Sequence, residues 1–313
     1  MKRIFITRRL PPIAKELLGK HFQVDSSEEN APLPLVKLKE ITSNYDGILT
    51  TVSEKMTADI LNNSSVQVIS NYAVGLDNID LAAAQSKGIS IYNTPNVVTE
   101  STADLTLALL LAWTRKIHSA RDFIYQDKWK SWDPELFLGE ELSGKTLGII
   151  GFGKIGRAVA KRALGFGLQV IYYNRSTPPA DEPIPVAIQQ VELPFLLNNA
   201  DYISLHLPLT KETKHFIGKK EFLQMQKKPV LINMARGGVV HTDDLVEALQ
   251  KGFIRGACLD VTDPEPLPAS HPLCKKDNCL IIPHIGTATK ECRSMMARRA
   301  AENIIDHFKD SVK

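Results

Sequence analysis

The sequence has little of what marks membrane-spanning, disulfide-rich or nucleic-acid-binding proteins. Its 313 residues include only four cysteines, too few and too irregularly spaced to crosslink such a chain, so reduced thiols are expected. The longest apolar run, Leu105 to Trp113, is about half as long as a membrane span. The apolar stretch near the start, IFIT, is too short for a signal peptide, and a cytoplasmic protein is therefore expected. Lysine plus arginine (38) nearly balances aspartate plus glutamate (35) without a basic tract, which argues against a nucleic-acid partner.

Several signatures of catalytic and metal sites are also missing. The chain has no GxSxG elbow, no HExxH pair and no GKS or GKT phosphate loop, so hydrolase, metalloprotease and P-loop functions lack support. One short stretch does offer zinc-compatible ligands, namely His271, Cys274, Cys279 and His284. Their spacing matches no common zinc pattern, and Cys279 opens the apolar run CLII, which is typical of a buried strand. No metal is expected.

The sequence does contain a regular alternation of strand-like and helix-like segments. Strand-like runs near the start are KRIFIT (2–7), YDGILTT (45–51), VQVISN (66–71) and ISIYN (89–93). A second series downstream comprises TLGII, LQVIYY, YISLHL, PVLINM, GACLDV and CLIIPH. Strands that alternate with helices predict an α/β fold with parallel sheets. A length of 313 residues favours two domains over one.

The boundary between the two domains is expected near the proline-containing turn NTPNVV (93–98), where a long helix follows from Thr99 or Ser101. The last helical stretch, from Lys290 to about Phe308, places apolar residues close to one face, namely Met295, Met296, Ala300, Ile304 and Phe308. We expect this helix to fold back on the first domain. The prediction is a discontinuous substrate-binding domain of residues 1–98 and 288–313, and a dinucleotide-binding domain of residues 99–287.

The motif GFGKIG at 151–156 predicts dinucleotide binding. It follows the strand-like TLGII and leads into the helix-like RAVAKRALGFG, which is the required strand-turn-helix context. In such a unit, Gly151 permits the tight turn, Gly153 lets a pyrophosphate approach the backbone, and Gly156 lets helix and strand pack closely. The start of the helix then offers free N–H donors to the anion.

The end of the next strand indicates which dinucleotide is bound. LQVIYY ends in Asn174, Arg175 and Ser176, near the position where an acid ordinarily accepts from the adenosine ribose hydroxyls. An acid would repel a 2′-phosphate, whereas these residues can donate to it. The alternative is that Arg175 is a solvated loop residue. We expect NADPH, with NADH possible but weaker.

Arg236, Glu265 and His284 are the candidate catalytic residues. Arg236 follows PVLINM and His284 follows CLIIP, at strand ends where doubly wound sheets open towards ligands. The forked guanidinium suits a carboxylate and a neighbouring carbonyl oxygen, and Gly237 and Gly238 are expected to leave it uncrowded. The imidazole can donate a proton to a ketone oxygen as hydride arrives, and Glu265 could orient it and favour its protonated form.

These residues occur in blocks that resemble the D-isomer-specific 2-hydroxyacid dehydrogenase family over essentially the whole chain. The blocks are NYAVGLDNID, LGIIGFGKIG, HLPLT, NMARGGVV, CLDVTDPEP and PHIGTAT, in the family's order. The resemblance implies a flavodoxin-like and a dinucleotide-binding Rossmann-like domain with the active site in the cleft between them, and usually a homodimer. KSWDP around Trp132 and NRS at 174–176 are similar to the glyoxylate and hydroxypyruvate reductase branch.

The resemblance also implies roles for individual residues. Arg236, Glu265 and His284 would form the catalytic set, and the backbone N–H groups of Val74 and Gly75 would help bind the substrate carboxylate. Trp132 would reach the substrate pocket of the partner subunit. The residues expected around the cofactor are Gly151, Gly153, Lys154, Ile155, Gly156, Asn174, Arg175, Ser176, Leu207, Pro208, Thr213, Met234, Ala235, Asp260 and Gly286, with Asp260 near the nicotinamide carboxamide. His206 is expected to pack near the cofactor without reacting.

The expected reaction is NADPH-dependent reduction of a small 2-oxo acid, glyoxylate or hydroxypyruvate, to the D-2-hydroxy acid. His284 would act as the general acid, and domain closure would exclude water. Two alternatives stay open. One is an NAD-dependent D-2-hydroxyacid dehydrogenase of the D-lactate or phosphoglycerate type. The other is a non-catalytic dinucleotide-sensing module that resembles the corepressors related to this family.

Overall fold

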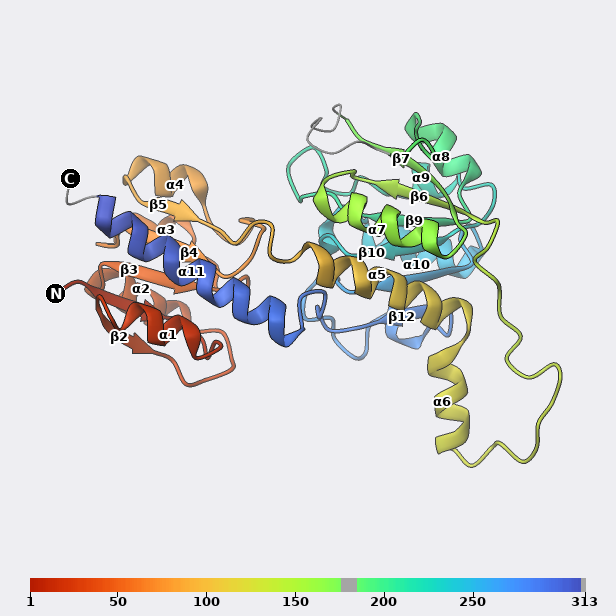
Figure 1. Ribbon diagram of the computed structural model, residues 1–313, viewed down its shortest axis with the longest axis horizontal. Helices are drawn as coiled ribbons and strands as arrows, with labels where there is room; N and C mark the ends of the chain where they lie inside the picture. Colours follow the sequence, from red (N-terminus) through yellow and green to blue (C-terminus); the bar gives the residue numbers. More distant parts are fainter. Residues whose placement is uncertain (176–184, 311–313) are drawn as a thin grey trace. The chain divides into compact units, whose positions relative to one another are not determined.

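The computed structural model describes residues 1–175 and 185–310, and the chain divides into two compact units (Figure 1). Unit 1 combines Met1–Val98 with Thr287–Lys313, and unit 2 is Thr99–Gly286. The return crossing therefore lies at 286/287, one residue before the position expected from the sequence. Each unit contains one parallel sheet, so the predicted α/β class is confirmed.

Unit 1 is built on a sheet with the strand order β2-β1-β3-β4-β5, which is the flavodoxin-like order. Its strands are β1 (Arg3–Ile6), β2 (Gln23–Ser26), β3 (Gly47–Thr50), β4 (Val68–Asn71) and β5 (Ser90–Tyr92). Its helices are α1 (Ile13–Leu18), α2 (Leu35–Asn44), α3 (Ala58–Leu61), α4 (Leu81–Ser86) and α11 (Lys290–Asp310). α4 begins after Asp80, whose carboxylate accepts the N–H of Ala83 at 3.0 Å and so caps the helix.

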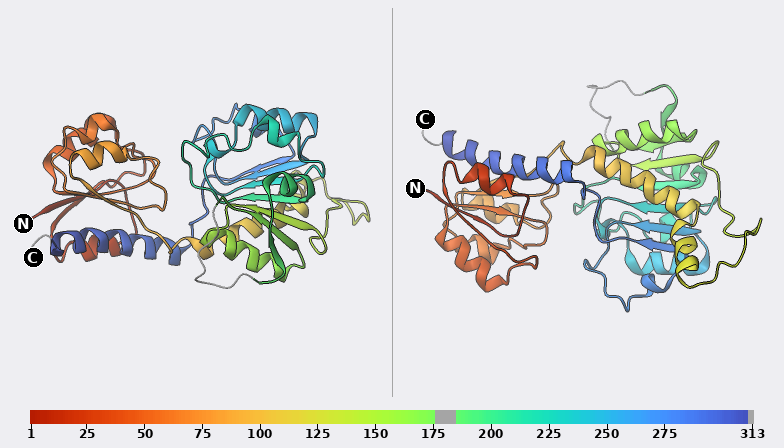
Figure 2. Two further views of the ribbon diagram at one scale, coloured as in Figure 1. Left: turned by 90° about the horizontal axis from the view of Figure 1, so that it is seen from above. Right: turned by 60° about the horizontal axis from the view of Figure 1, so that its bottom comes forward.

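Helices cover both faces of the unit 1 sheet (Figure 2). α1 and α11 pack together on one face, and α2, α3 and α4 lie on the other. α11 contacts β3 and β4, and its Ala297, Ala300, Ala301 and Ile304 are all buried. Met295, which was placed on this apolar face by the periodicity, is instead 47% exposed. The buried stripe of α11 therefore runs through Met296 and not through Met295.

Unit 2 is built on a larger sheet with the order β12-β11-β10-β9-β6-β7-β8. Its strands are β6 (Thr146–Ile150), β7 (Gln169–Tyr173), β8 (Ile188–Gln190), β9 (Tyr202–Leu205), β10 (Val230–Asn233), β11 (Gly256–Leu259) and β12 (Cys279–Ile281). Its α-helices are α5 (Thr99–Thr114), α6 (Ile117–Tyr125), α7 (Lys154–Gly165), α8 (Leu193–Asn199), α9 (Lys219–Phe222) and α10 (Thr242–Lys251), and short 3₁₀ turns occur at Gly237–Val239 and Pro272–Lys275.

Two separate cores lie on the two faces of the unit 2 sheet. Alternate strand residues contribute to each, as the two-residue period of a strand requires: Ile149 packs with α5 and α7, whereas Ile150 packs with α8 and α10. Because both faces are covered, the strands are apolar throughout, which is why TLGII and VLIN read as buried strands in the sequence.

The strand register brings the carboxyl ends of six strands into one row. Direct partners along this row are Tyr173, Ile150, Leu205, Asn233, Leu259 and Ile281. The strand order changes direction between β6 and β9, and ligands of doubly wound sheets bind outside the carboxyl ends at such a point. The loops after this row therefore carry the candidate site.

Several observed elements have no counterpart among the elements expected from the sequence, for example the strands β2 and β8 and the helix α6. Among the residues the structure describes, no helix is both long and apolar enough to cross a bilayer.

Candidate functional site

The glycine loop joins β6 to α7, and each of its three glycines lies in a different structural environment. Gly151 has φ +94°, and a Cβ there would lie 2.7 Å from the carbonyl oxygen of His206. A Cβ on Gly156 would overlap the carbonyl oxygen of Gly151, so this glycine lets the helix begin close to the strand. A Cβ on Gly153 would meet no described atom within 4 Å. The fold itself does not require glycine at 153, and this open space beside the N-terminus of α7 fits a pyrophosphate.

Three candidate side chains follow neighbouring strands of the unit 2 sheet. Arg236 follows β10, Glu265 lies in the loop after β11, and His284 follows β12. Since these strands are adjacent and parallel, the three residues share the carboxyl edge of the sheet. This is the edge on which the glycine loop also lies.

His284 and Glu265 form a direct hydrogen bond, with 2.6 Å between His284 Nδ1 and Glu265 Oε1. The other Glu265 oxygen accepts the N–H of Thr262 at 3.4 Å. Burial alone would raise the pKa of Glu265, but the hydrogen bond and charge of His284 lower it below its ordinary value, with smaller contributions from Thr262 and from the charge of Arg236. Glu265 is therefore an acceptor at neutral pH, and Nε2 is the ring nitrogen of His284 that it leaves available.

Asp260 holds the turn on which His284 lies. His284 has φ +52°, a left-handed conformation that is uncommon for a residue other than glycine. The Asp260 carboxylate accepts the N–H groups of Ile285 at 2.6 Å and Gly286 at 2.9 Å, and its carbonyl oxygen accepts the N–H of His284 at 2.8 Å. Burial raises the pKa of Asp260, and the two amide hydrogen bonds oppose that rise. This supporting role was not expected from the sequence.

Asn233 performs the corresponding task for Arg236. Its side-chain amide donates to the Arg236 carbonyl at 2.9 Å, and its Oδ1 accepts the N–H of Ala235 at 3.0 Å. Asn233 is 1% exposed and closes the otherwise apolar strand VLIN. A polar residue at the end of such a strand is the sequence signal that identifies it.

The structure shows a reason for glycine at 237 that was not expected from the sequence. A Cβ on Gly237 would overlap the backbone of Thr262, in the loop that carries Glu265. A Cβ on Gly238 would meet its nearest atoms at 3.4 to 3.5 Å, which is ordinary contact. Gly237 therefore permits the close approach of two backbone segments, after β10 and after β11.

Three of the four zinc-compatible side chains considered above have other partners. His271 Nδ1 accepts the N–H of Leu273 at 3.2 Å, the Cys274 thiol points at the Pro268 carbonyl with 3.7 Å between sulfur and oxygen, and His284 is bonded to Glu265. Within residues 1–175 and 185–310, no group of three or more His, Cys, Asp or Glu side chains is arranged to hold a metal ion.

The family description "D-isomer specific 2-hydroxyacid dehydrogenase, NAD binding domain" matches residues 107–286. The chain belongs to this family. Glyoxylate reductase of Thermococcus litoralis is 43% identical over 99% of this chain and 95% of its own length. Among solved structures, the TT0316 protein of Thermus thermophilus is 41% identical, with a TM-score of 0.90 and coverage of 98% and 97%. An NADPH-dependent glyoxylate/hydroxypyruvate reductase of Sinorhizobium meliloti, solved with NADP and malonate, is 28% identical, with a TM-score of 0.84 and coverage of 98% and 93%.

This 2-hydroxyacid dehydrogenase is thus an oxidoreductase that uses a nicotinamide dinucleotide, and the resemblance to the glyoxylate reductase branch is confirmed. Around the expected ribose site, the Asn174 side-chain oxygen accepts the N–H of Phe152 in the glycine loop at 3.1 Å. Asn174 therefore already supports the loop through its oxygen. Arg175 is exposed. Ser176 lies outside the described residues.

The loop after β9 contains an acid that interacts electrostatically with Arg175. Thr213 Oγ1 donates to the Pro208 carbonyl at 2.6 Å and accepts the N–H of Thr210 at 2.7 Å. A hydrogen bond from Thr210 chiefly lowers the pKa of Glu212, and the positive charge of Arg175 adds to this effect. Glu212 of this 2-hydroxyacid dehydrogenase thus lies within electrostatic range of Arg175, although the two residues are far apart in the sequence.

His206 follows β9 and lies beside the glycine loop. Burial lowers the pKa of His206 to about 3, and its Nε2 is 2.8 Å from Ser204 Oγ. Its backbone carbonyl lies against Gly151. Its place beside the glycine loop is consistent with packing near the cofactor.

The remaining expected residues lie as follows. Lys154 and Ile155 begin α7, Leu207 follows β9, and Met234 and Ala235, each 7% exposed, follow β10. In unit 1, Val74 and Gly75 lie in the loop between β4 and α4, with Val74 39% exposed. Trp132, in unit 2, is 80% exposed.

Proposed function

We propose that this 2-hydroxyacid dehydrogenase reduces a small 2-oxo acid, glyoxylate or hydroxypyruvate, to the D-2-hydroxy acid with NADPH. The observation that carries the proposal is the 2.6 Å contact between His284 Nδ1 and Glu265 Oε1, on the same sheet edge as Arg236 and the glycine loop. An oriented imidazole beside a guanidinium provides a proton donor and a carboxylate anchor.

In the proposed mechanism, Arg236 and the backbone N–H groups of Val74 and Gly75 bind the substrate carboxylate. The bound dinucleotide supplies a hydride to C2 of the 2-oxo acid. His284 gives the Nε2 proton to the carbonyl oxygen, which becomes the hydroxyl of the product, while Glu265 accepts from Nδ1–H and stabilises the imidazolium before transfer. Asp260 keeps the turn that carries His284 in place, as its amide contacts indicate.

NADPH preference is proposed on the basis of charge. Asn174 and Arg175 occupy positions where an acid would repel a 2′-phosphate, and the guanidinium can pair with that phosphate. Glu212, close enough to Arg175 to interact with its charge, acts against this preference. The Sinorhizobium relative, which binds NADP, provides additional support.

We also propose a homodimer. Within unit 2, α6 and the segment after it stand apart from the sheet (Figure 1), and this arm exposes several large apolar side chains. These are Ile124 (53%), Tyr125 (78%), Trp129 (55%), Trp132 (80%) and Leu138 (64%). An apolar arm of this kind favours burial against a second copy, and Trp132 would then reach the partner's substrate pocket. Sedimentation of wild type and Trp132→Ala tests the homodimer, and KM for glyoxylate in a dimeric Trp132→Ala variant tests the contact with the pocket.

The decisive experiment follows absorbance loss from NADPH and NADH in parallel, with glyoxylate, hydroxypyruvate and pyruvate. Rapid NADPH-linked reduction of the first two is expected. Preference for NADH or pyruvate would replace the proposal with an NAD-dependent dehydrogenase of the D-lactate or phosphoglycerate type. Tight NADPH binding without turnover would favour a dinucleotide sensor.

A further inference from the structure

The loop of unit 1 that carries Val74 and Gly75 is held through its carbonyl groups. The Ala73 carbonyl accepts the backbone N–H of Thr94 at 2.8 Å, and the Val74 carbonyl accepts the side-chain amide of Asn93 at 2.7 Å. Next along the chain, the Gly75 carbonyl accepts the side-chain amide of Asn71 at 2.8 Å. Three successive peptide groups are thus anchored on one side.

Anchoring a carbonyl also sets the direction of the N–H in the same peptide. A trans peptide group is planar, and its C=O and N–H point in opposite directions. The bond to Thr94 therefore turns the Val74 N–H away from the anchor, and the bond to Asn93 does the same for the Gly75 N–H. No hydrogen bond between described residues uses the N–H of Val74 or of Gly75. The anchors leave two adjacent donors for a ligand.

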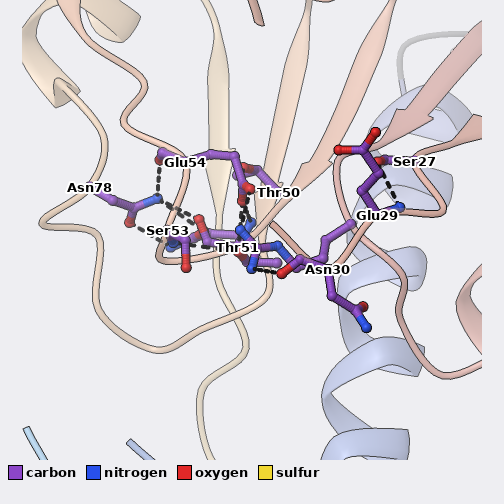
Figure 3. A network of polar contacts seen from close by, with 10 residues as sticks. Ser27, Glu29, Asn30, Thr50, Thr51, Ser53, Glu54 and Asn78 are labelled. Carbon is purple, nitrogen blue, oxygen red and sulfur yellow. Dashed lines mark hydrogen bonds and ion pairs between the residues drawn. The ribbon is translucent and has the colours of Figure 1, made fainter. Parts of the chain in front are cut away.

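A buried polar network around Thr51, Glu54 and Asn78, which Figure 3 shows, supports the Asn71 anchor. Asn71 donates to Asn78 Oδ1 at 3.0 Å, and Asn78 donates to the carbonyls of Thr51 at 3.0 Å and Glu54 at 3.1 Å. The Glu54 carboxylate, whose side chain is fully buried, accepts from the Thr51 hydroxyl at 2.6 Å and pairs with Arg8 at 2.8 Å.

Such a network contributes little to net stability, because burying an ion pair costs desolvation that its attraction barely offsets. It does favour the observed geometry, because breaking one of these contacts would leave a buried polar group without that partner, which is costly. The network is continuous from Arg8 to the Gly75 carbonyl, and α11 reinforces the second anchor because Asn303 donates to the Asn93 carbonyl at 2.9 Å.

We infer that Asn93 and Asn71 are positioning residues, which hold the Val74–Gly75 loop so that its two amides face the substrate carboxylate. The inference rests on the proposed function, in which these amides bind that carboxylate. Neither asparagine needs to touch the substrate. Asn93 acts through the peptide that carries the Gly75 N–H, whereas Asn71 holds the next carbonyl, that of Gly75, and so fixes the end of the loop.

The test compares Asn93→Leu, which has a similar shape without a donor, with Asn93→Gln, which retains a carboxamide. Asn93→Leu should raise KM for glyoxylate and the inhibition constant of malonate together, by about tenfold, since one charge-assisted hydrogen bond is misdirected. KM for NADPH should stay within about twofold. Asn93→Gln should recover part of the loss.

Asn44→Ala is the matched control, because the Asn44 amide also donates to a backbone carbonyl in unit 1, that of Glu40 at 2.8 Å, remote from the loop. It should leave every constant unchanged. Asn71→Ala repeats the test at the buried anchor, and Asn93→Leu decides the matter if that variant does not fold.

Wild-type constants for glyoxylate and malonate in folded Asn93→Leu would overturn the inference, as would equal losses for NADPH and glyoxylate. The proposed function fails separately, if wild-type enzyme reduces no 2-oxo acid or if Arg236→Ala leaves KM for glyoxylate unchanged. Calorimetric binding of malonate in the presence of NADP keeps the inference testable in that event, and absence of malonate binding to the wild type would overturn both.

Discussion

Replacing Gly237 by alanine tests how the catalytic loops are brought together. A Cβ at 237 would overlap the backbone of Thr262, so the loop after β11 must retreat by on the order of 1 Å to restore ordinary contact. Glu265 lies in that loop, and its 2.6 Å hydrogen bond to His284 would lengthen. Displacement of about 1 Å in a catalytic arrangement costs about 100-fold in rate, so Gly237→Ala should lower kcat by that order.

Gly238→Ala provides the matched control. Its added Cβ would meet Leu209 at 3.4 Å and Asp263 at 3.5 Å, which the structure accommodates, and neither glycine has a positive φ that alanine would strain. Steady-state kinetics with NADPH and glyoxylate, with thermal unfolding and NADPH titration in parallel, separates the variants. If both lose activity equally, crowding of Arg236 is the cause and the backbone argument is refuted. Normal kcat in Gly237→Ala would refute it as well.

Three further predictions concern charge. Asp260→Ala should lower kcat strongly and reduce the free energy of unfolding by about 1–3 kcal/mol, because the amides of the turn that carries His284 lose their acceptor. Unchanged kinetics and an unchanged melting temperature would contradict this prediction. The lowered pKa of Glu265 implies stability that is present above its ordinary value of 4.5 and lost as pH falls through the folded-state pKa. The melting temperature of Glu265→Gln should thus fall below that of wild type at neutral pH and converge with it in strong acid, and a constant difference would count against the linkage. Arg175→Ala should weaken NADPH selectively and Glu212→Gln should strengthen it, as measured by KM for both dinucleotides; equal effects on NADH would remove the phosphate assignment.

Much of the architecture could be predicted because strands buried on both faces are apolar throughout. TLGII, VLIN and GACL are such segments, and they form central strands. The edge strands β2 and β8, QVDS and IQQ, are short and largely polar, so their sequences carry no comparable signal. Met295 shows the limit of periodicity, because neighbours on one helical stripe can differ in burial.

Part of the candidate site could also be predicted from the sequence. The glycine loop consists of a strand, a turn and a helix in succession. Its function can therefore be predicted from consecutive residues. Arg236, Glu265 and His284 are each recognisable as polar residues after apolar strands, and their common edge follows from parallel pairing.

The sequence by itself therefore determined the class of fold, the presence of a dinucleotide loop and the family, because short-range patterns record which residues are buried and which turns need glycine. Only the tertiary structure decided that Gly237 lies against Thr262, that Asp260 caps the turn of His284, and that Asn71 and Asn93 hold the loop of Val74. The physical reason is that these contacts join segments far apart in the chain or depend on the direction of single peptide groups. A carboxamide looks the same in a sequence whether it faces solvent or fixes a peptide.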